Sequence, residues 1–312
     1  MFKIKLYNKI AKVGLDRLDP AKFVYGEEIE LPDAIIVRSA KITPEHLTPG
    51  LKCIVRAGAG VNNICVDECR ERGIAVFNTP GANANAVKEL AIAALILASR
   101  DIVGGIAWTR ANASDSDVPT LVEKGKAQFT GPEIIGKTLG LIGTGAVGAL
   151  VARAANALGM RVLAADPFLS EGARTALSDC VTFVDDGKVK LGDFTEVFAQ
   201  SDYISLHAPV TADTRGGVNS STIAKMRDGV RIVNLARAEL VDDDALLAAL
   251  ASGKVARYVT DLPTNKTADA AGVIAIPHLG SSTPESEDNC AIMAADTVTN
   301  YFINNATTGN IR

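Results

Sequence analysis

The chain has 312 residues, of which 47% are hydrophobic and 22% charged, and its formal net charge at pH 7 is −4. This length predicts about two domains, and the composition excludes intrinsic disorder. The mildly acidic charge gives no reason to expect nucleic acid or a membrane as a partner. Its five cysteines include no C-x-x-C pair, and no apolar run approaches the ~20 residues that span a bilayer. We therefore expect a cytoplasmic protein with free thiols and no bound metal.

Short runs rich in valine and isoleucine alternate with helical patterns along the chain, which is typical of parallel sheets covered by helices on both faces. Expected strands are 4–7, 34–37, 53–56 and 75–77 in a first series, and 139–142, 162–165, 203–206, 232–235, 258–260 and 273–276 in a second. Helices are expected over 66–72, 83–99, 149–158 and 284–304, whereas 100–136 is less regular. Because the final helix crosses back to the first series, we expect two Rossmann-like α/β domains, the first flavodoxin-like and discontinuous.

Residues 143–148 read Gly-Thr-Gly-Ala-Val-Gly and fit G-x-G-x-x-G between an expected strand and an expected helix. In this setting the glycines permit a tight turn, close approach to a pyrophosphate, and packing of helix on strand. Asp166 closes the next strand, where its carboxylate would accept ribose hydroxyls and repel a 2′-phosphate. Neither Pro167 nor Phe168 places an arginine beside it. The motif predicts a dinucleotide site that favours NAD over NADP.

Several stretches, in order along nearly the whole chain, resemble the D-isomer-specific 2-hydroxyacid dehydrogenase family, and within it most closely the D-3-phosphoglycerate dehydrogenases. The resemblance implies a catalytic domain of residues 1–97 and 285–312, split around an NAD-binding domain of residues 98–284, with the active site in the cleft between them. The matching stretches are 37–39, 56–63, 78–80, 143–148, 207–209, 234–237 and 278–282.

By this resemblance His278 is the general base that takes the C2 hydroxyl proton, a role that suits an imidazole near neutral pH. Arg237 would bind the substrate carboxylate and polarise the C2 oxygen, a bidentate task that lysine performs poorly. Taken alone, the first could be a polar turn residue and the second a solvated loop arginine. The implied cofactor contacts are Gly143, Thr144, Gly145, Ala146, Val147, Gly148, Asp166, Pro167, His207, Ala208, Pro209, Thr214, Leu235, Ala236, Asp261 and Gly280.

One part of the family pattern is missing. In the family, a glutamate a few residues beyond the aspartate numbered Asp261 here hydrogen-bonds the catalytic histidine. An ungapped count puts Lys266 at that position, and a one-residue gap puts Asn265 there. Asp269 is the only acid strictly between Asp261 and His278, and whether it replaces the glutamate is left open.

The expected substrate follows from charge. 3-Phosphoglycerate carries a carboxylate and a phosphate, so its site needs cations in addition to Arg237. Basic residues near the ends of the first-series strands could each be solvated, but their joint placement in matching motifs favours NAD-dependent oxidation of D-3-phosphoglycerate to 3-phosphohydroxypyruvate, the first step of serine biosynthesis. The expected substrate contacts are Arg38, Ser39, Lys41, Arg56, Ala57 and Gly58.

Two alternatives stay open. The first is a reductase of glyoxylate or hydroxypyruvate, and the second is an NAD-sensing binding protein with little turnover, which the missing glutamate favours and Arg237 and His278 disfavour. The family implies a homodimer built on the NAD-binding domain, with Trp108 and its neighbours reaching the partner. Because the chain stops at residue 312, soon after the last expected helix, we also expect no serine-binding domain and no inhibition by serine. The chain would then be a short form or a truncated piece.

Overall fold

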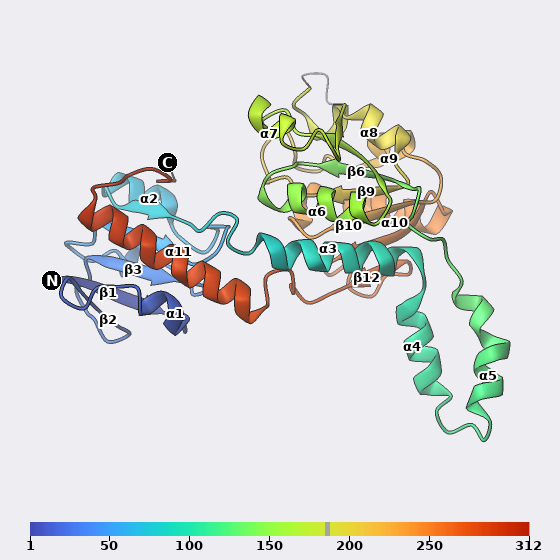
Figure 1. The fold of residues 1–312 in the computed structure, drawn as a ribbon, viewed down its shortest axis with the longest axis horizontal. Coiled ribbons are helices and arrows are strands. Elements are labelled where there is room, and N and C mark those ends of the chain that lie inside the picture. The colour runs from blue at the N-terminus through green and yellow to red at the C-terminus, as the bar shows by residue number, and fades with distance from the viewer. Residues whose placement is uncertain (185–187, 312) are drawn as a thin grey trace. The chain divides into compact units, whose positions relative to one another are not determined.

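The computed structural model describes residues 1–184 and 188–311. The chain divides into two compact units, the first formed by Met1–Ala86 with Ser281–Arg312 and the second by Val87–Gly280. Each unit contains one parallel β-sheet (Figure 1), so the predicted α/β class with two Rossmann-like domains is confirmed. The domain boundaries expected at 97/98 and 284/285 fall inside helices α3 and α11, and they stay predictions.

The first unit has a five-stranded parallel sheet in the order β2-β1-β3-β4-β5, which is the flavodoxin-like order. Every strand of the first series was predicted except β2, which is short and follows a loop. Helix α11 returns to this unit from the far end of the chain, as the sequence predicted. The elements are β1 (Phe2–Tyr7), α1 (Lys12–Leu15), β2 (Phe23–Gly26), β3 (Ala34–Val37), η1 (Pro44–His46), β4 (Cys53–Arg56), α2 (Val66–Glu71), β5 (Ala75–Phe77) and α11 (Pro284–Ile303).

Apolar cores cover both faces of this first sheet. On one face Ile36 and Val55 pack with Ala294 of α11, and on the other Ile35 and Ile54 pack with residues of α2 and the loops. Because alternate residues of a strand point to opposite faces, a strand buried on both faces must be apolar throughout. The continuous apolar runs in β3 and β4 therefore reflect cover on both sides.

The second unit has a seven-stranded parallel sheet in the order β12-β11-β10-β9-β6-β7-β8. The first strand, β6, pairs with both β7 and β9, so the strand order reverses direction at β6, as in dinucleotide-binding folds. Its strands are β6 (Thr138–Ile142), β7 (Arg161–Ala165), β8 (Thr182–Phe183), β9 (Tyr203–Leu206), β10 (Val230–Asn234), β11 (Val255–Thr260) and β12 (Val273–Ala275). Its main helices are α3 (Ala84–Ser99), α6 (Ala146–Ala157), α7 (Glu171–Thr175), α8 (Thr195–Gln200), α9 (Ser220–Lys225) and α10 (Asp243–Ser252).

The expectation that residues 100–136 are less regular is wrong. They contain helices α4 (Ile102–Ala111) and α5 (Val118–Gly125), which extend away from the sheet of the second unit (Figure 1). Each helix begins at an aspartate cap: Asp101 accepts a hydrogen bond from the amide of Gly104, and Asp117 accepts one from Thr120. Within the described chain these helices bury none of their residues, so they are not core helices of this unit.

The described residues contain no single membrane-spanning helix and no metal-binding cluster of side chains. No single helix there is long and apolar enough to cross a membrane, although α3 and α4, bent by 69°, would pass together on length and composition. The same residues contain no group of three or more histidine, cysteine, aspartate or glutamate side chains arranged to hold a metal ion.

Candidate functional site

The three glycines of the 143–148 loop have different geometric roles. Gly143 has a φ of +90°, and a Cβ there would lie 2.9 Å from the carbonyl oxygen of His207. A Cβ on Gly148 would lie 2.2 Å from the carbonyl oxygen of Gly143, so helix α6 packs directly on the loop. A Cβ on Gly145 would meet only open space, at the N-terminus of α6. The loop therefore leaves room for a pyrophosphate against the helix amides.

Asp166 follows strand β7 and is bound to the glycine loop. One of its carboxylate oxygens, Oδ2, accepts hydrogen bonds from the amide and hydroxyl of Thr144 at 2.7 and 3.1 Å. A pocket of about 370 Å³ lies beside it and brings together many of the predicted cofactor residues. Sequence reasoning missed the apolar contributions of Phe168, Val189 and Phe194. The full lining is Ile142, Gly143, Gly145, Ala165, Asp166, Pro167, Phe168, Val189, Phe194, His207, Ala208, Pro209, Thr211 and Thr214.

An arginine also contacts the turn that carries Asp166. The two residues after Asp166 are not arginines, but helix α7 brings Arg174 back to the same turn, where its guanidinium donates to the backbone carbonyl of Asp166. The guanidinium also stacks over the ring of Phe183, 4.6 Å from its centroid. Sequence reasoning considered only the residues adjacent to Asp166 and therefore missed Arg174.

The loop after β9 carries His207, which lines the pocket. Its Nε2 lies 2.9 Å from the hydroxyl of Ser205, and burial lowers the pKa of the imidazole to about 4. This histidine is therefore neutral at physiological pH. Thr214 shapes the same loop, because its hydroxyl donates to the carbonyl of Pro209 at 2.6 Å and accepts from the amide of Thr211.

Arg237 lies in a turn that a buried asparagine holds in place. The Oδ1 atom of Asn234, at the end of β10, accepts hydrogen bonds from the amides of Ala236 and Arg237 at 3.1 and 3.3 Å. Its Nδ2 donates to the carbonyl of Arg237 at 2.8 Å. The turn leaves the guanidinium of Arg237 exposed. Sequence reasoning missed Asn234, although an asparagine at a strand end is a common sign of such a turn.

Asp261 follows strand β11 and is almost fully buried, at 1% exposure. Its Oδ2 accepts from the amide of Gly280 at 2.8 Å, and its backbone carbonyl accepts from the amide of His278 at 2.8 Å. Burial raises the pKa of this carboxyl, whereas the Gly280 hydrogen bond and the charges of His278 and Arg237 act to lower it. Asp261, His278 and Arg237 are therefore within electrostatic reach of one another. Among the described residues, Oδ1 of Asp261 has no hydrogen-bond partner.

The segment between Asp261 and His278, where the family glutamate would be expected, contacts helix α10. Lys266, the residue at the ungapped position, forms an ion pair with Asp244 near the start of α10, with Nζ–Oδ distances of 2.7 and 2.8 Å. Asn265 and Asp269 are exposed on the loop before β12. Whether Asp269 takes over the glutamate's role stays open, and Asp261 is a carboxyl group whose pKa the charge of His278 acts to lower.

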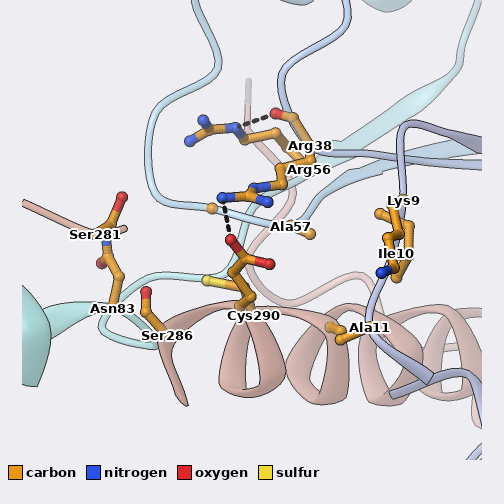
Figure 2. A pocket seen from close by; sticks show the side chains of 13 residues that line it. Lys9, Ile10, Ala11, Arg38, Arg56, Ala57, Asn83, Ser281, Ser286 and Cys290 are labelled. Atoms are coloured by element: carbon orange, nitrogen blue, oxygen red, sulfur yellow. Dashed lines mark hydrogen bonds and ion pairs between the residues drawn. The ribbon is translucent and has the colours of Figure 1, made fainter. Parts of the chain in front are cut away.

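The first unit has a pocket of its own, shown in Figure 2. Of the predicted substrate residues, the structure brings together Arg38, Arg56, Ala57 and Gly58 in its lining, but not Ser39 or Lys41. The lining also contains residues that sequence reasoning missed: Lys9, Ile10, Ala11, Asn83, Ser281, Ser286, Glu287, Cys290 and Ala291.

The arginines of this pocket are held by specific contacts. Nε of Arg56 donates to the backbone carbonyl of Arg38 at 3.0 Å (Figure 2). Nη2 of Arg38 lies 2.7 Å from Oε1 of Glu287. Gly58 has a φ of +152°, and a Cβ there would lie 2.5 Å from Nη1 of Arg56. Glycine at this position therefore gives the guanidinium of Arg56 its space.

The order of the seven-stranded sheet and its glycine loop define a dinucleotide-binding domain of the dehydrogenase type. Residues 92–280 match the model of the "D-isomer specific 2-hydroxyacid dehydrogenase, NAD binding domain". The chain belongs to this family of NAD-dependent D-2-hydroxyacid dehydrogenases, as its sequence motifs predicted, and its cofactor is NAD.

Several known proteins are similar to the chain. It is 34% identical over 319 aligned residues to a D-3-phosphoglycerate dehydrogenase of Bacillus subtilis, covering 96% of this chain and 57% of the relative. It is 39% identical over 275 residues to a hydroxypyruvate reductase of Thermotoga maritima, covering 83% of this chain and 81% of the relative. The NAD⁺-bound 3-phosphoglycerate dehydrogenase of Entamoeba histolytica is 29% identical with a TM-score of 0.77, covering 100% and 98% of the two chains. The chain thus spans little more than half the length of the Bacillus relative.

Proposed function

We propose that this chain performs the NAD-dependent oxidation of D-3-phosphoglycerate to 3-phosphohydroxypyruvate. The observation that carries the proposal is the first unit's pocket, where Lys9, Arg38 and Arg56 place three cations in one lining. A substrate with a single carboxylate needs fewer cations than this pocket supplies, whereas a phosphorylated hydroxy acid carries enough negative charge to use them. The similarity to phosphoglycerate dehydrogenases from several organisms agrees with this proposal.

The residues of the second unit fit NAD and the chemistry it supplies. The open space at Gly145 would accept the pyrophosphate, and the carboxylate of Asp166 would accept the ribose hydroxyls. NAD, when bound, accepts the hydride that leaves C2 of the substrate. His278 takes the proton of the C2 hydroxyl, and Arg237 binds the carboxylate and polarises the C2 oxygen. Asp261 favours the imidazolium of His278 once the proton has transferred, because it places a carboxylate within electrostatic reach.

The proposal is tested by following NADH formation with D-3-phosphoglycerate, D-glycerate and D-lactate as alternative substrates. We expect kcat/KM to be highest for the phosphorylated substrate, because it alone carries a phosphate for the cationic pocket. Equal or greater kcat/KM for D-glycerate or D-lactate would contradict the proposal.

A second candidate function is the reduction of hydroxypyruvate. The hydroxypyruvate reductase of Thermotoga maritima favours it, because this relative matches the chain at 39% identity over most of both lengths. The two functions are separated by following NADH oxidation with hydroxypyruvate and with 3-phosphohydroxypyruvate. Higher kcat/KM with hydroxypyruvate would establish the second candidate, and NAD binding without turnover of any substrate would instead favour an NAD-sensing protein.

We also propose that the protein is a homodimer that pairs through helices α4 and α5. Exposed apolar side chains lie on α4, with Ile102, Val103 and Ile106 exposed by 36%, 46% and 48%. Trp108, on the same helix, lines an apolar groove between these helices and η2 (Lys126–Phe129). Apolar surface of this kind is typical of a protein interface.

The dimer proposal is tested by light scattering at micromolar concentration. We expect the mass of a dimer for the unchanged protein and a shift toward monomer for Ile106→Asp, which puts a charge on the apolar surface. Leu31→Asp is the matched control, because Leu31 is also exposed, at 61%, but lies in the first unit. A monomeric unchanged protein, or equal effects of the two substitutions, would contradict the proposal.

A further inference from the structure

The cationic pocket of the first unit contains one carboxylate that no step of the reaction uses. Its lining holds the positive side chains of Lys9, Arg38 and Arg56, and among them the negative side chain of Glu287. Oε1 of Glu287 lies 2.7 Å from Nη2 of Arg38. An anion that enters this pocket therefore meets a carboxylate already bound to one of the guanidinium groups it would use.

The position of Glu287 at the start of a helix does not explain why this acid lines the pocket. Acids are favoured in the first turn of a helix by the helix dipole, and α11 has two there, Glu285 and Glu287. The dipole explains why an acid is tolerated at either position, but of the two only Glu287 belongs to the pocket lining. The helix start is also secured separately, because the hydroxyl of Thr283 accepts from the amide of Ser286 at 3.1 Å.

Glu287 is also not needed to place the loop that carries Arg38. The carbonyl of Arg38 accepts a hydrogen bond from Arg56. Oδ1 of Asn8 accepts from the amides of Ser39 and Ala40 at 2.9 and 2.7 Å, which fixes the backbone just after Arg38. These contacts hold the loop without Glu287, so the main consequence of Glu287 is its charge.

The ion pair between Arg38 and Glu287 is accessible to a ligand. The side chains of Arg38 and Glu287 are 39% and 43% exposed, so an incoming anion can reach the guanidinium. Glu287 then repels that anion, and the repulsion grows with the anion's charge. At a separation of ~5 Å in water, this interaction corresponds to about fourfold in affinity per unit of ligand charge, and about 15-fold for a dianion.

We propose that Glu287 is a specificity-determining residue that offsets part of the pocket's positive charge and so limits its preference for dianionic phosphate groups over single carboxylates. This inference rests on the proposed function, because it assumes that the pocket receives the substrate anion. Glu287 then sets how strongly the protein distinguishes phosphorylated from unphosphorylated hydroxy acids.

The first test measures anion binding and needs no assumption about the substrate. The dissociation constants of inorganic phosphate, a dianion at pH 8, and of formate, a monoanion, are measured for the full chain by calorimetry. We expect Glu287→Gln to tighten phosphate binding about 15-fold and formate binding about fourfold. Glu285→Gln removes the same charge two residues away on α11 and should change both dissociation constants by less than twofold. Glu287→Asp keeps the charge and should preserve the ratio of the phosphate and formate dissociation constants.

The second test compares kcat/KM for D-3-phosphoglycerate and D-glycerate. Their ratio should rise about 15-fold in Glu287→Gln, because Arg237 binds the carboxylate of both substrates and only the phosphate dianion meets Glu287. Equal changes for the two anions, or weaker binding of both, would overturn the inference, because a purely structural residue does not discriminate by ligand charge. If no variant oxidises D-3-phosphoglycerate but the phosphate-to-formate ratio still shifts, the proposed function fails and the role of Glu287 stands. If D-3-phosphoglycerate is oxidised and neither ratio shifts, the role of Glu287 alone fails.

Discussion

The amide of Gly280 donates a hydrogen bond to Oδ2 of Asp261 at 2.8 Å, across nineteen residues of chain. The amide of His278 donates to the backbone carbonyl of the same aspartate, so Asp261 binds both sides of the turn that carries the histidine. His278 itself has a φ of +44°, a conformation that non-glycine residues adopt only when the surrounding structure holds them. The position of the proposed base therefore depends on a buried acid.

Our first prediction concerns the pH dependence of stability in Asp261→Asn. Burial raises the pKa of Asp261 above its value of about 3.9 in an unfolded chain, so its carboxyl favours the folded state below that pH. This contribution is lost as the pH rises through the folded pKa. Asparagine does not titrate, so Asp261→Asn should gain stability relative to the unchanged protein as the pH rises from 4 to 8.

The measurement is the free energy of unfolding in urea at both pH values. Asp269→Asn is the matched control, because Asp269 is an exposed acid of the same connecting segment. A parallel pH dependence for Asp261→Asn and the unchanged protein would refute the prediction.

Our second prediction separates two glycines of the cofactor loop. Alanine at Gly148 would place a Cβ 2.2 Å from the carbonyl of Gly143, so Gly148→Ala should lower the free energy of unfolding by about 1–3 kcal/mol. Alanine at Gly145 meets open space, so Gly145→Ala should change stability by less than about 1 kcal/mol. It should nevertheless weaken NAD binding about tenfold, or ~1.4 kcal/mol, by obstructing the pyrophosphate.

Urea unfolding and fluorescence titration with NAD measure these two effects independently. Each variant serves as the control for the other, since one is expected to lose stability and the other affinity. Normal NAD affinity in Gly145→Ala would show that the pyrophosphate does not approach this glycine.

Our third prediction concerns the choice between NAD and NADP. Asp166→Ala removes a negative charge that repels a 2′-phosphate, and we expect it to tighten NADP binding by about 15-fold for a dianionic phosphate. Arg174, whose guanidinium already reaches the Asp166 turn, should then contribute to binding that phosphate. Dissociation constants for NAD and NADP, measured by fluorescence titration, test both statements. The double variant Asp166→Ala/Arg174→Ala should bind NADP more weakly than Asp166→Ala does, and an equal gain in both variants would exclude a role for Arg174.

Our fourth prediction concerns the proposed base. His278→Ala should lower kcat by ~10²-fold or more, because general acid–base catalysis contributes about that much to the rate. His46→Ala is the control: His46 lies in the first unit, where its Nδ1 is hydrogen-bonded to Thr43. Steady-state kinetics of NADH formation measure both variants. Near-normal turnover in His278→Ala would rule out the histidine as the acid–base group.

The strands could be predicted closely from the sequence because burial on both faces makes them continuous apolar runs. Strand β3 (Ala34–Val37) was expected at its observed bounds, and β9 (Tyr203–Leu206) likewise. Helices α4 and α5 were missed although each begins at an aspartate cap, because both are short and none of their residues is buried in the described chain. Strands β2 and β8 were missed because they are partly exposed and therefore lack a continuous apolar run.

The local parts of the candidate site could also be predicted from the sequence. The glycine loop and Asp166 depend on backbone conformation within one strand–loop–helix unit, so residue type and spacing are enough to predict them. The substrate-binding residues were predicted less well. Arg38 and Arg56 line one pocket, as expected, but Ser39 and Lys41 do not line it.

The sequence by itself determined the α/β class, the position of the nucleotide loop and the family, because these depend on periodicity and short-range spacing. Tertiary structure alone brought Arg174 to the Asp166 turn, enclosed Asp261 beneath His278, and paired Glu287 with Arg38. The last pair joins residues almost 250 positions apart, through a helix that returns to the sheet it covers. Electrostatic contacts depend on distance in space and on exclusion of water, and neither quantity is encoded in the spacing of residues along the chain.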